Sequence, residues 1–355
     1  MPQSSLELYT SIVPSPRQTA FQEDGFHVFF HYGINTFTNK EWGDGKLPPN
    51  YLTPPGKARI NGWKPYLPQA LERILTAKHH DGFCLWPTET TEYCVRNSPY
   101  RAGHGDVVRE VSDSCKKYGL KFGIYLSLWD RNCPLYGTPE YNDFYVRQLT
   151  ELLTGYGENF LHLAGWGVRR EDGRKEPYPY DFDRVYKTVR ELQPDAVISN
   201  CGPDIRWVGN ESGRARKSEW NVVPAFSCET QNIASHSQQT DAQDMKQQAS
   251  DSHLEDLGSR AFLANYDSFM WYPAEVDVSI RPGWFYHKKE SRRVRSLENL
   301  LRIYYGSVGG NSLLLLNVPP DTEGLLHEMD VRRLKELGDE IKKGVQLPAL
   351  VSNVS

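Results

Sequence analysis

The stretch Ile74-Leu-Thr-Ala-Lys-His-His-Asp-Gly-Phe83 joins a short apolar run to a cluster of polar side chains. The run at 73–77 is typical of a buried strand, and Gly82 opens a turn after it. An α/β barrel delivers polar groups to the open end of its sheet in this way. Because neighbouring residues of a strand face opposite sides, His79 and His80 are expected to have different roles. The alternative is that one or both are structural histidines bonded to the backbone.

Eight strand-like segments, most of them followed by a helical pattern, predict an α/β protein with a (β/α)8 TIM-like barrel. The expected strands are 26–33, 73–77, 121–129, 157–165, 196–200, 221–226, 269–275 and 311–317, and the expected helices are 106–118, 139–156, 181–192 and 330–343. A barrel takes about 250 residues or more. We therefore expect a catalytic barrel at 21–345, after a lead-in at 1–20 and before a tail at 346–355, with a polar surface excursion at 229–258.

The composition excludes several classes of protein. A net charge of −4 with mixed signs gives no basic face for nucleic acid. No apolar run has the length of a membrane helix, and the first six residues lack the features of a signal peptide. The six cysteines show no metal-type spacing, which predicts free thiols in a reducing compartment. We expect a cytoplasmic protein with no membrane partner, metal or cofactor.

The segment after the first expected strand should form the first barrel helix but is rich in proline. Six prolines lie within 21 residues: Pro48, Pro49, Pro54, Pro55, Pro65 and Pro68. Each proline inside a helix costs about 3 kcal/mol. The first barrel helix is therefore expected to be broken or absent.

Four stretches resemble the α-L-fucosidases of glycoside hydrolase family 29, and the resemblance runs from about Pro14 to Lys343. The stretches are His31–Gly45, Thr76–Pro87, Gly202–Ser212 and Trp271–Phe285. The resemblance implies retaining hydrolysis of terminal α-L-fucose from a fucosylated oligosaccharide or glycoconjugate. Ile34–Phe37 and Glu41–Gly45 resemble the branch that acts on 1,3- and 1,4-linked fucose. Family members often continue into a C-terminal β-sandwich, and we expect that module to be absent because the chain stops at Ser355.

Retaining hydrolysis needs two carboxyl groups about 5–5.5 Å apart. The resemblance assigns the general acid/base to Glu211, with a solvated loop glutamate as the alternative, and makes Glu275 the second candidate. It also implies a set of substrate-binding residues: His31, Glu41, Trp42, His79, His80, Tyr125, Trp129, Glu275 and Trp284. Within this set Trp284 is expected to border the leaving-group sugar. Tyr125 is equally consistent with a packed barrel residue.

The expected nucleophile is missing. The family's nucleophilic aspartate closes the fourth strand, and by ungapped count its place falls on Gly165. The nearest downstream acids, Glu171 and Asp172, lie in a charged, loop-like segment. We interpret 51–71 and 158–170 as local frameshifts, because suitable codons restore the family element of each segment in another reading frame. The alternatives are a catalytically dead fucose-binding protein and an unstable pseudogene product.

Overall fold

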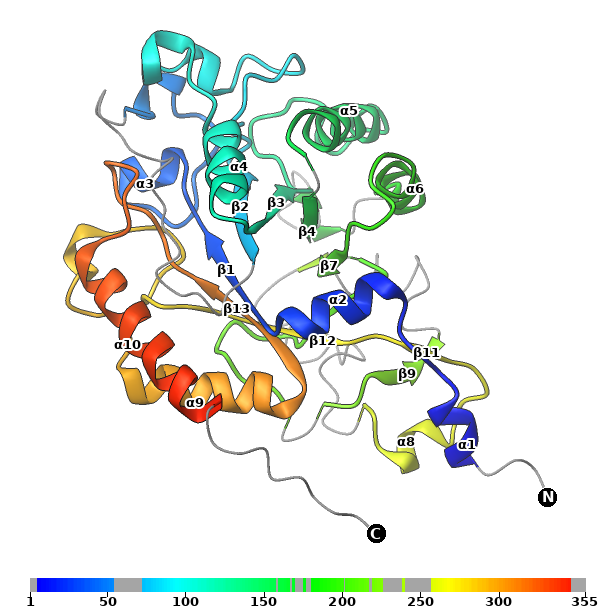
Figure 1. Cartoon of the computed structure of the whole chain (residues 1–355). Helices are drawn as coiled ribbons and strands as arrows, with labels where there is room; N and C mark the ends of the chain where they lie inside the picture. Colours follow the sequence, from blue (N-terminus) through cyan, green and yellow to red (C-terminus); the bar gives the residue numbers. More distant parts are fainter. Residues whose placement is uncertain are drawn as a thin grey trace.

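The computed structural model describes residues 5–53, 72–157, 159–166, 168–169, 175–176, 180–200, 202–216, 219–225, 238–239 and 257–345. Parallel strands in these ranges form one curled sheet (Figure 1). Their order is β10-β4-β3-β2-β1-β13-β12-β8, with β7 also paired to β4. Their bounds are β1 Phe26–Phe30, β2 Glu72–Lys78, β3 Lys121–Ser127, β4 Asn159–Trp166, β7 Ile198–Asn200, β8 Arg206–Trp207, β10 Gln238–Gln239, β12 Ala274–Ser279 and β13 Ser312–Asn317. A parallel bridge between Ser199 and Ile205 connects β7 with the β8 edge. The sheet thus curls back on itself, as in a (β/α)8 barrel.

Helices surround this sheet (Figure 1). Their bounds are α1 Ser5–Thr10, α2 Pro16–Asp24, α3 Ile34–Thr38, α4 Val107–Lys117, α5 Glu140–Gly155, α6 Phe182–Leu192, α8 Arg260–Leu263, α9 Leu297–Ser307 and α10 Glu328–Val345. Polar side chains fix where several helices begin. Asp106 accepts the backbone N–H of Arg109 at the start of α4, and Asp181 accepts that of Arg184 at the start of α6. Such caps satisfy N–H groups that have no partner within the helix.

Alternation along the strands builds two apolar layers. One layer fills the inside of the curled sheet, with Phe29, Ile74, Tyr125, Leu313 and Leu315. The other lies between the sheet and the helices, with Val28, Leu75, Ile124, Val276 and Leu314. Each such side chain contributes roughly 1.5–3 kcal/mol when buried. The carboxyl ends of the strands are left to carry polar groups.

Most of the predicted elements are confirmed, but the sixth and seventh strands are not. The segment predicted at 221–226 forms β9 (Val222–Pro224), which pairs antiparallel with β11 (Phe269–Trp271) outside the curled sheet. The sheet continues instead through β8. The segment predicted at 269–275 is divided, because Pro273 lacks the N–H for a continuous ladder and β12 begins only at Ala274. Apolar pattern alone does not distinguish an antiparallel ribbon from a barrel strand.

Several predictions fall outside the described residues. These include most of the proline-rich segment 51–71, residues 158, 167 and 170 of the segment 158–170, most of the excursion at 229–258 and the tail at 346–355. Cys84, Cys94, Cys115 and Cys133 are free thiols, as predicted. In the described ranges, no helix is both long and apolar enough to cross a membrane.

Candidate functional site

Aromatic and histidine rings from several strand ends meet at the carboxyl end of the sheet. The ring centroids of His31 and His79 lie 5.5 Å apart, and those of His79 and His80 lie 4.2 Å apart. The ring centroid of Trp42 lies 5.6 Å from that of His80 and 5.7 Å from that of Trp129. The structure therefore brings these five predicted residues together. His79 and His80 both follow β2 rather than lying on it, so strand alternation does not separate their rings, and their different roles stay a prediction.

Tyr125 and Trp284 complete this ring cluster. Tyr125 lies 6.0 Å from His79 and 5.6 Å from Phe29, a residue of the apolar interior. Tyr125 is therefore a packed barrel residue that also contacts the ring cluster. Packing in the barrel and a place in the candidate site do not exclude each other. Trp284 follows β12 and lies 5.0 Å from His31. The predicted substrate-binding rings thus form one continuous cluster.

Asn317 fixes the tautomer of His31. Its amide nitrogen donates to Ser279 Oγ over 2.9 Å and to the Trp284 carbonyl over 2.8 Å. The amide oxygen must then face His31 Nδ1, which lies 2.9 Å away. His31 Nδ1 consequently carries a proton, and a neutral His31 presents Nε2 as an acceptor.

Ser127 fixes the tautomer of His80 in the same way. Its hydroxyl donates to the Trp129 carbonyl over 2.7 Å, so it can only accept from His80 Nδ1, 2.7 Å away. Burial, with the nearby charge of His31, lowers the pKa of His80 to about 3. Burial and His80 likewise lower the pKa of His79 well below its ordinary value. Neutral imidazoles suit an uncharged ligand rich in hydroxyl groups.

Glu41 binds the segment that carries Trp284. Its carboxylate accepts the Trp284 backbone N–H over 2.7 Å and the Phe285 N–H over 3.4 Å, and it pairs with His287. A Cβ at Gly283 would lie 2.2 Å from Glu41 Oε1, so a larger residue there would displace the Glu41 carboxylate. Glu41 thus anchors the loop after β12, in addition to the substrate-binding role expected from the sequence.

Glu211 lies beside Trp284, whose indole N–H donates to Glu211 Oε2 over 3.0 Å. Desolvation of the carboxyl raises the pKa of Glu211, and the negative charge of Glu41 raises it further. The Trp284 hydrogen bond opposes the rise. A raised pKa favours the protonated form, which a general acid requires. Although Glu211 is exposed, it is bound to the ring cluster and is not a freely solvated loop residue.

A second carboxyl near Glu211 was missed in the sequence. An antiparallel bridge between Ser212 and Val278 brings the segment of Glu211 alongside β12. Asp277 on that strand is buried and accepts the indole N–H of Trp207 over 2.8 Å. Burial, followed by the charge of Glu211, raises the pKa of Asp277 well above its ordinary value. The structure therefore places Asp277 near Glu211, although the resemblance assigned Asp277 no role.

Glu275, the second candidate acid, lies deeper in the barrel. It is fully buried and accepts the Ser199 hydroxyl over 3.0 Å. Asp277 lies two residues further along β12, and residues two apart share a face of a strand. Because Glu275 was a candidate acid, the alternation of side chains along a strand could have identified Asp277, two residues later, as a carboxyl on the same face.

Gly165 lies near the carboxyl end of β4. The preceding residue, Ala164, is the register partner of Ser127 on β3, and Gly165 itself pairs with Gln238. Gly165, the position expected for the nucleophile, therefore lies one residue further along β4 than the partner of Ser127, which binds His80. Glycine supplies no carboxylate there. Glu171 and Asp172 lie outside the described residues.

One group of described side chains has the composition of a metal site. His27 Nε2 lies 3.1 Å from Asp24 Oδ2 and 3.5 Å from Glu72 Oε2. This group lies at the opposite end of the barrel from the ring cluster, at the start of β1 and β2. The Lys121 ammonium binds both oxygens of Asp24, at 2.7 and 2.6 Å. These side chains already form a network of ion pairs, and we assign them no role at the candidate site.

Comparison with known proteins gives one consistent family. The family model described as "Alpha-L-fucosidase" matches residues 73–344. The chain is similar to alpha-L-fucosidase 1 of Arabidopsis thaliana, with 42% identity over 331 residues, or 92% of this chain and 60% of that protein. The chain therefore spans about three fifths of the length of that relative.

Solved structures show the same similarity. A proposed alpha-L-fucosidase from Bacteroides ovatus ATCC 8483 superposes with a TM-score of 0.86 and 46% identity, covering 97% of this chain and 59% of that one. A Ruminococcus gnavus family 29 fucosidase in complex with fucose superposes with a TM-score of 0.76 and 29% identity, covering 94% of this chain and 68% of that one.

Proposed function

Because the chain belongs to the alpha-L-fucosidase family, glycoside hydrolase family 29, we propose that its ring cluster binds the terminal α-L-fucosyl residue of a fucosylated glycan. The hydrogen bonds of two histidines carry this proposal. His31 and His80 each direct Nδ1 toward a protein acceptor, which leaves Nε2 of the neutral ring as the acceptor for a sugar hydroxyl. Trp42 and Trp129 supply aromatic faces for the apolar side of the sugar.

The same proposal makes Glu211 the general acid/base of retaining hydrolysis. In retaining hydrolysis the protonated carboxyl gives its proton to the glycosidic oxygen while a nucleophilic carboxylate bonds to the anomeric carbon, and the resulting Glu211 carboxylate then takes a proton from the water that displaces this nucleophile. Its raised pKa and its contact with Trp284 support this role. Trp284 would then border the leaving group.

We further propose that the fucose is 1,3- or 1,4-linked within a branched glycan. The support is sequence similarity in two short elements, Ile34–Phe37 and Glu41–Gly45. The second element contains Glu41, which anchors the Trp284 loop, and Trp42, which lies in the ring cluster. Substrate choice is therefore expected to depend on this loop.

A second function, fucose binding without turnover, is favoured by Gly165. Retention cannot begin without a carboxylate near the anomeric carbon. The test combines hydrolysis of an aryl α-L-fucoside with the melting temperature at increasing fucose concentration. A melting temperature that rises with fucose, without hydrolysis of the aryl fucoside, supports binding alone. A rise in melting temperature together with hydrolysis supports an active enzyme. No rise at saturating fucose contradicts the proposed pocket.

A further inference from the structure

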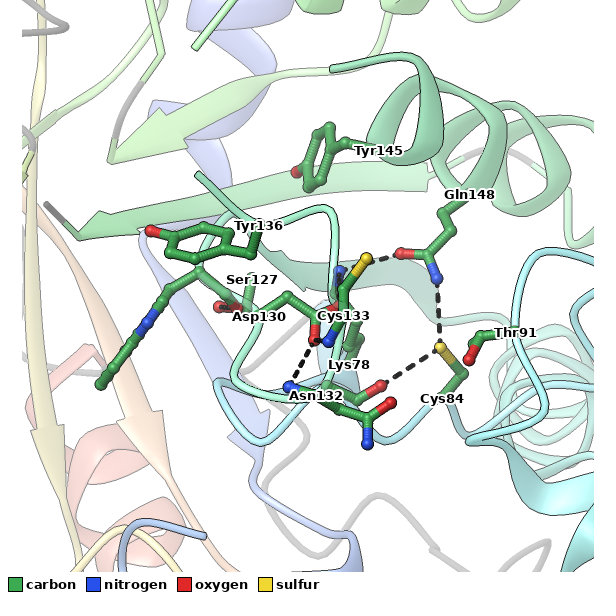
Figure 2. A network of polar contacts seen from close by, with 12 residues as sticks. Lys78, Cys84, Thr91, Ser127, Asp130, Asn132, Cys133, Tyr136, Tyr145 and Gln148 are labelled. Carbon is green, nitrogen blue, oxygen red and sulfur yellow. Dashed lines mark hydrogen bonds and ion pairs between the residues drawn. The ribbon is translucent and has the colours of Figure 1, made fainter. Parts of the chain in front are cut away.

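Lys78, at the end of β2, is a fully buried lysine outside the ring cluster. Its Nζ lies 3.1 Å from Asp130 Oδ2, 2.9 Å from Gln148 Oε1 and 3.4 Å from the Tyr141 hydroxyl. The register of β2 against β3 shifts between Thr76 and Lys78, which turns Lys78 away from the barrel interior and toward α5. Figure 2 shows Lys78 with Asp130 and Gln148 in one network. Three acceptors thus match the three protons of the ammonium group.

Asp130 connects this ammonium to a turn beside the candidate site. Its Oδ2 binds Lys78, while Oδ1 accepts the backbone N–H groups of Asn132 at 3.0 Å and Cys133 at 2.8 Å. A Cβ at Gly82 would lie 2.2 Å from Asp130 Oδ1, so β2 and this turn are in close contact. Both carboxylate oxygens of Asp130 are therefore used within the protein. This makes it a poor candidate for an alternative nucleophile.

The turn at 130–133 in turn holds the loop that carries Trp42. Arg131 donates its guanidinium N–H to the Gly43 carbonyl over 2.8 Å, and Asn132 donates its amide to the Gly45 carbonyl over 2.7 Å. The Arg131 backbone N–H also donates to the His80 carbonyl over 3.0 Å. The 43–45 loop and the end of β2 are thus joined through one turn, with Trp42 beside them.

We propose that Lys78 and Asp130 are positioning residues that hold Trp42 and Trp129 against His80, through the turn at 130–133. The inference rests on the proposed fucose pocket but concerns residues that do not touch it. A buried ion pair adds little net stability compared with packed apolar side chains. The pair instead sets the geometry of the turn. Asp130 accepts hydrogen bonds from two backbone N–H groups of the turn, and Lys78 holds the Asp130 carboxylate in place.

The test compares this ion pair with another buried pair at the opposite end of the barrel. Arg206 Nη2 lies 2.7 Å from Glu219 Oε2, and both side chains are as buried as Lys78 and Asp130. Lys78→Met and Asp130→Asn should weaken fucose binding at least tenfold by isothermal titration calorimetry. Arg206→Met should lower the melting temperature comparably and leave the affinity within twofold. Equal affinity for Lys78→Met and the unmodified chain would overturn the proposal.

A double-mutant cycle shows whether Lys78 acts through Trp42. If it does, adding Lys78→Met to Trp42→Ala should weaken fucose binding little beyond Trp42→Ala alone. Full additivity contradicts that pathway. Amide hydrogen exchange by mass spectrometry provides a readout that does not need fucose. Peptides covering 40–46 and 129–134 should exchange at least tenfold faster in Lys78→Met but not in Arg206→Met.

The two readouts separate the possible failures. If the unmodified chain binds no fucose but exchange accelerates in these peptides, the proposed function fails and the positioning role stands. If exchange in 40–46 is unchanged in Lys78→Met and Asp130→Asn, the positioning role fails whatever the affinity for fucose.

Discussion

Trp284 binds two carboxylates at once, with its indole N–H 3.0 Å from Glu211 Oε2 and its backbone N–H 2.7 Å from Glu41 Oε2. The candidate acid and the anchor of the loop after β12 are therefore held by one residue. Desolvation raises the pKa of Glu211, the indole hydrogen bond lowers it, and the charge of Glu41 raises it further. Loop geometry and acid strength are coupled at this point.

Replacing Glu211 by glutamine removes the proton donor and keeps the shape of the side chain. Any turnover that the chain or a repaired variant shows should fall by roughly 10²–10⁴-fold for substrates with poor leaving groups. Activated aryl fucosides need less protonation of the leaving oxygen and should lose much less. Steady-state kinetics on both substrate classes measures the difference, and equal losses would count against Glu211 as the acid.

His80 should make the fold sensitive to mild acid. Its pKa in the folded state is about 3, well below the ordinary value of 6.5, so below pH 6.5 the unfolded chain binds a proton that the folded chain does not. Stability is lost as the pH falls from 6.5, by up to about 1.4 kcal/mol per pH unit. His80→Gln should therefore show a shallower fall in melting temperature between pH 6.5 and 5. The exposed His104 supplies the control, and His104→Gln should keep the slope of the unmodified chain.

Local apolar and polar patterns predicted most strands of the curled sheet, and the family resemblance predicted a set of rings that the structure brings together. His79 and His80 follow an apolar strand, and the structure places them in the ring cluster with His31. What sequence did not predict depends on contacts between distant segments. The bridge from Ser212 to Val278 brings Glu211 alongside the strand of Asp277, and this proximity is a tertiary contact.

The unexpected pairing of the sixth and seventh predicted strands has a similar cause. β9 and β11 are as apolar as barrel strands but pair with each other, and which partner a strand takes is a tertiary property. Lys78 is another example, because a register shift turns it toward α5. Its role follows from Asp130 and Gln148, which lie 52 and 70 residues away in the chain.

The proline-rich segment 51–71 predicts a barrel of low stability. An amphipathic helix over a strand removes several large side chains from water, each worth roughly 1.5–3 kcal/mol. Losing two or three would use much of a typical margin of about 5–15 kcal/mol. We expect melting below about 60 °C together with binding of the dye ANS to the native chain. A cooperative transition above that temperature without ANS binding would contradict this prediction.

A small external anion should replace the missing nucleophile. Because Gly165 carries no carboxylate, azide or formate can approach the anomeric carbon of a bound aryl α-L-fucoside where the aspartate is expected. Azide at molar concentration should raise aryl release at least tenfold and yield the fucosyl azide of inverted configuration. Product analysis by NMR checks both points. Release that azide does not change, with retained configuration, would indicate that the chain supplies its own nucleophile, and Asp277→Asn should then abolish it.

The last prediction concerns where a carboxylate must be placed on β4. The register pairs Ala164 with Ser127, whose hydroxyl binds His80. Registered residues of neighbouring strands share a face, and a shift of one residue exchanges the two faces. Gly165→Asp alone should therefore recover little hydrolysis of an aryl fucoside, and Ala164→Asp should recover more. Similar activity in the two variants would contradict this assignment of the face.

Replacing the whole segment 159–166 by the frame-corrected Ile-Phe-Cys-Thr-Trp-Leu-Asp-Gly tests the frameshift interpretation. We expect β4 to move by one residue against β3, so that the aspartate at 165 reaches the level of Ser127. With 51–71 restored as well, activity should rise by orders of magnitude over the unmodified chain. Resequencing of the gene is the independent check, since clean in-frame codons through both segments would exclude a frameshift. Robust hydrolysis by the unmodified chain would show that Gly165 does not mark a lost nucleophile.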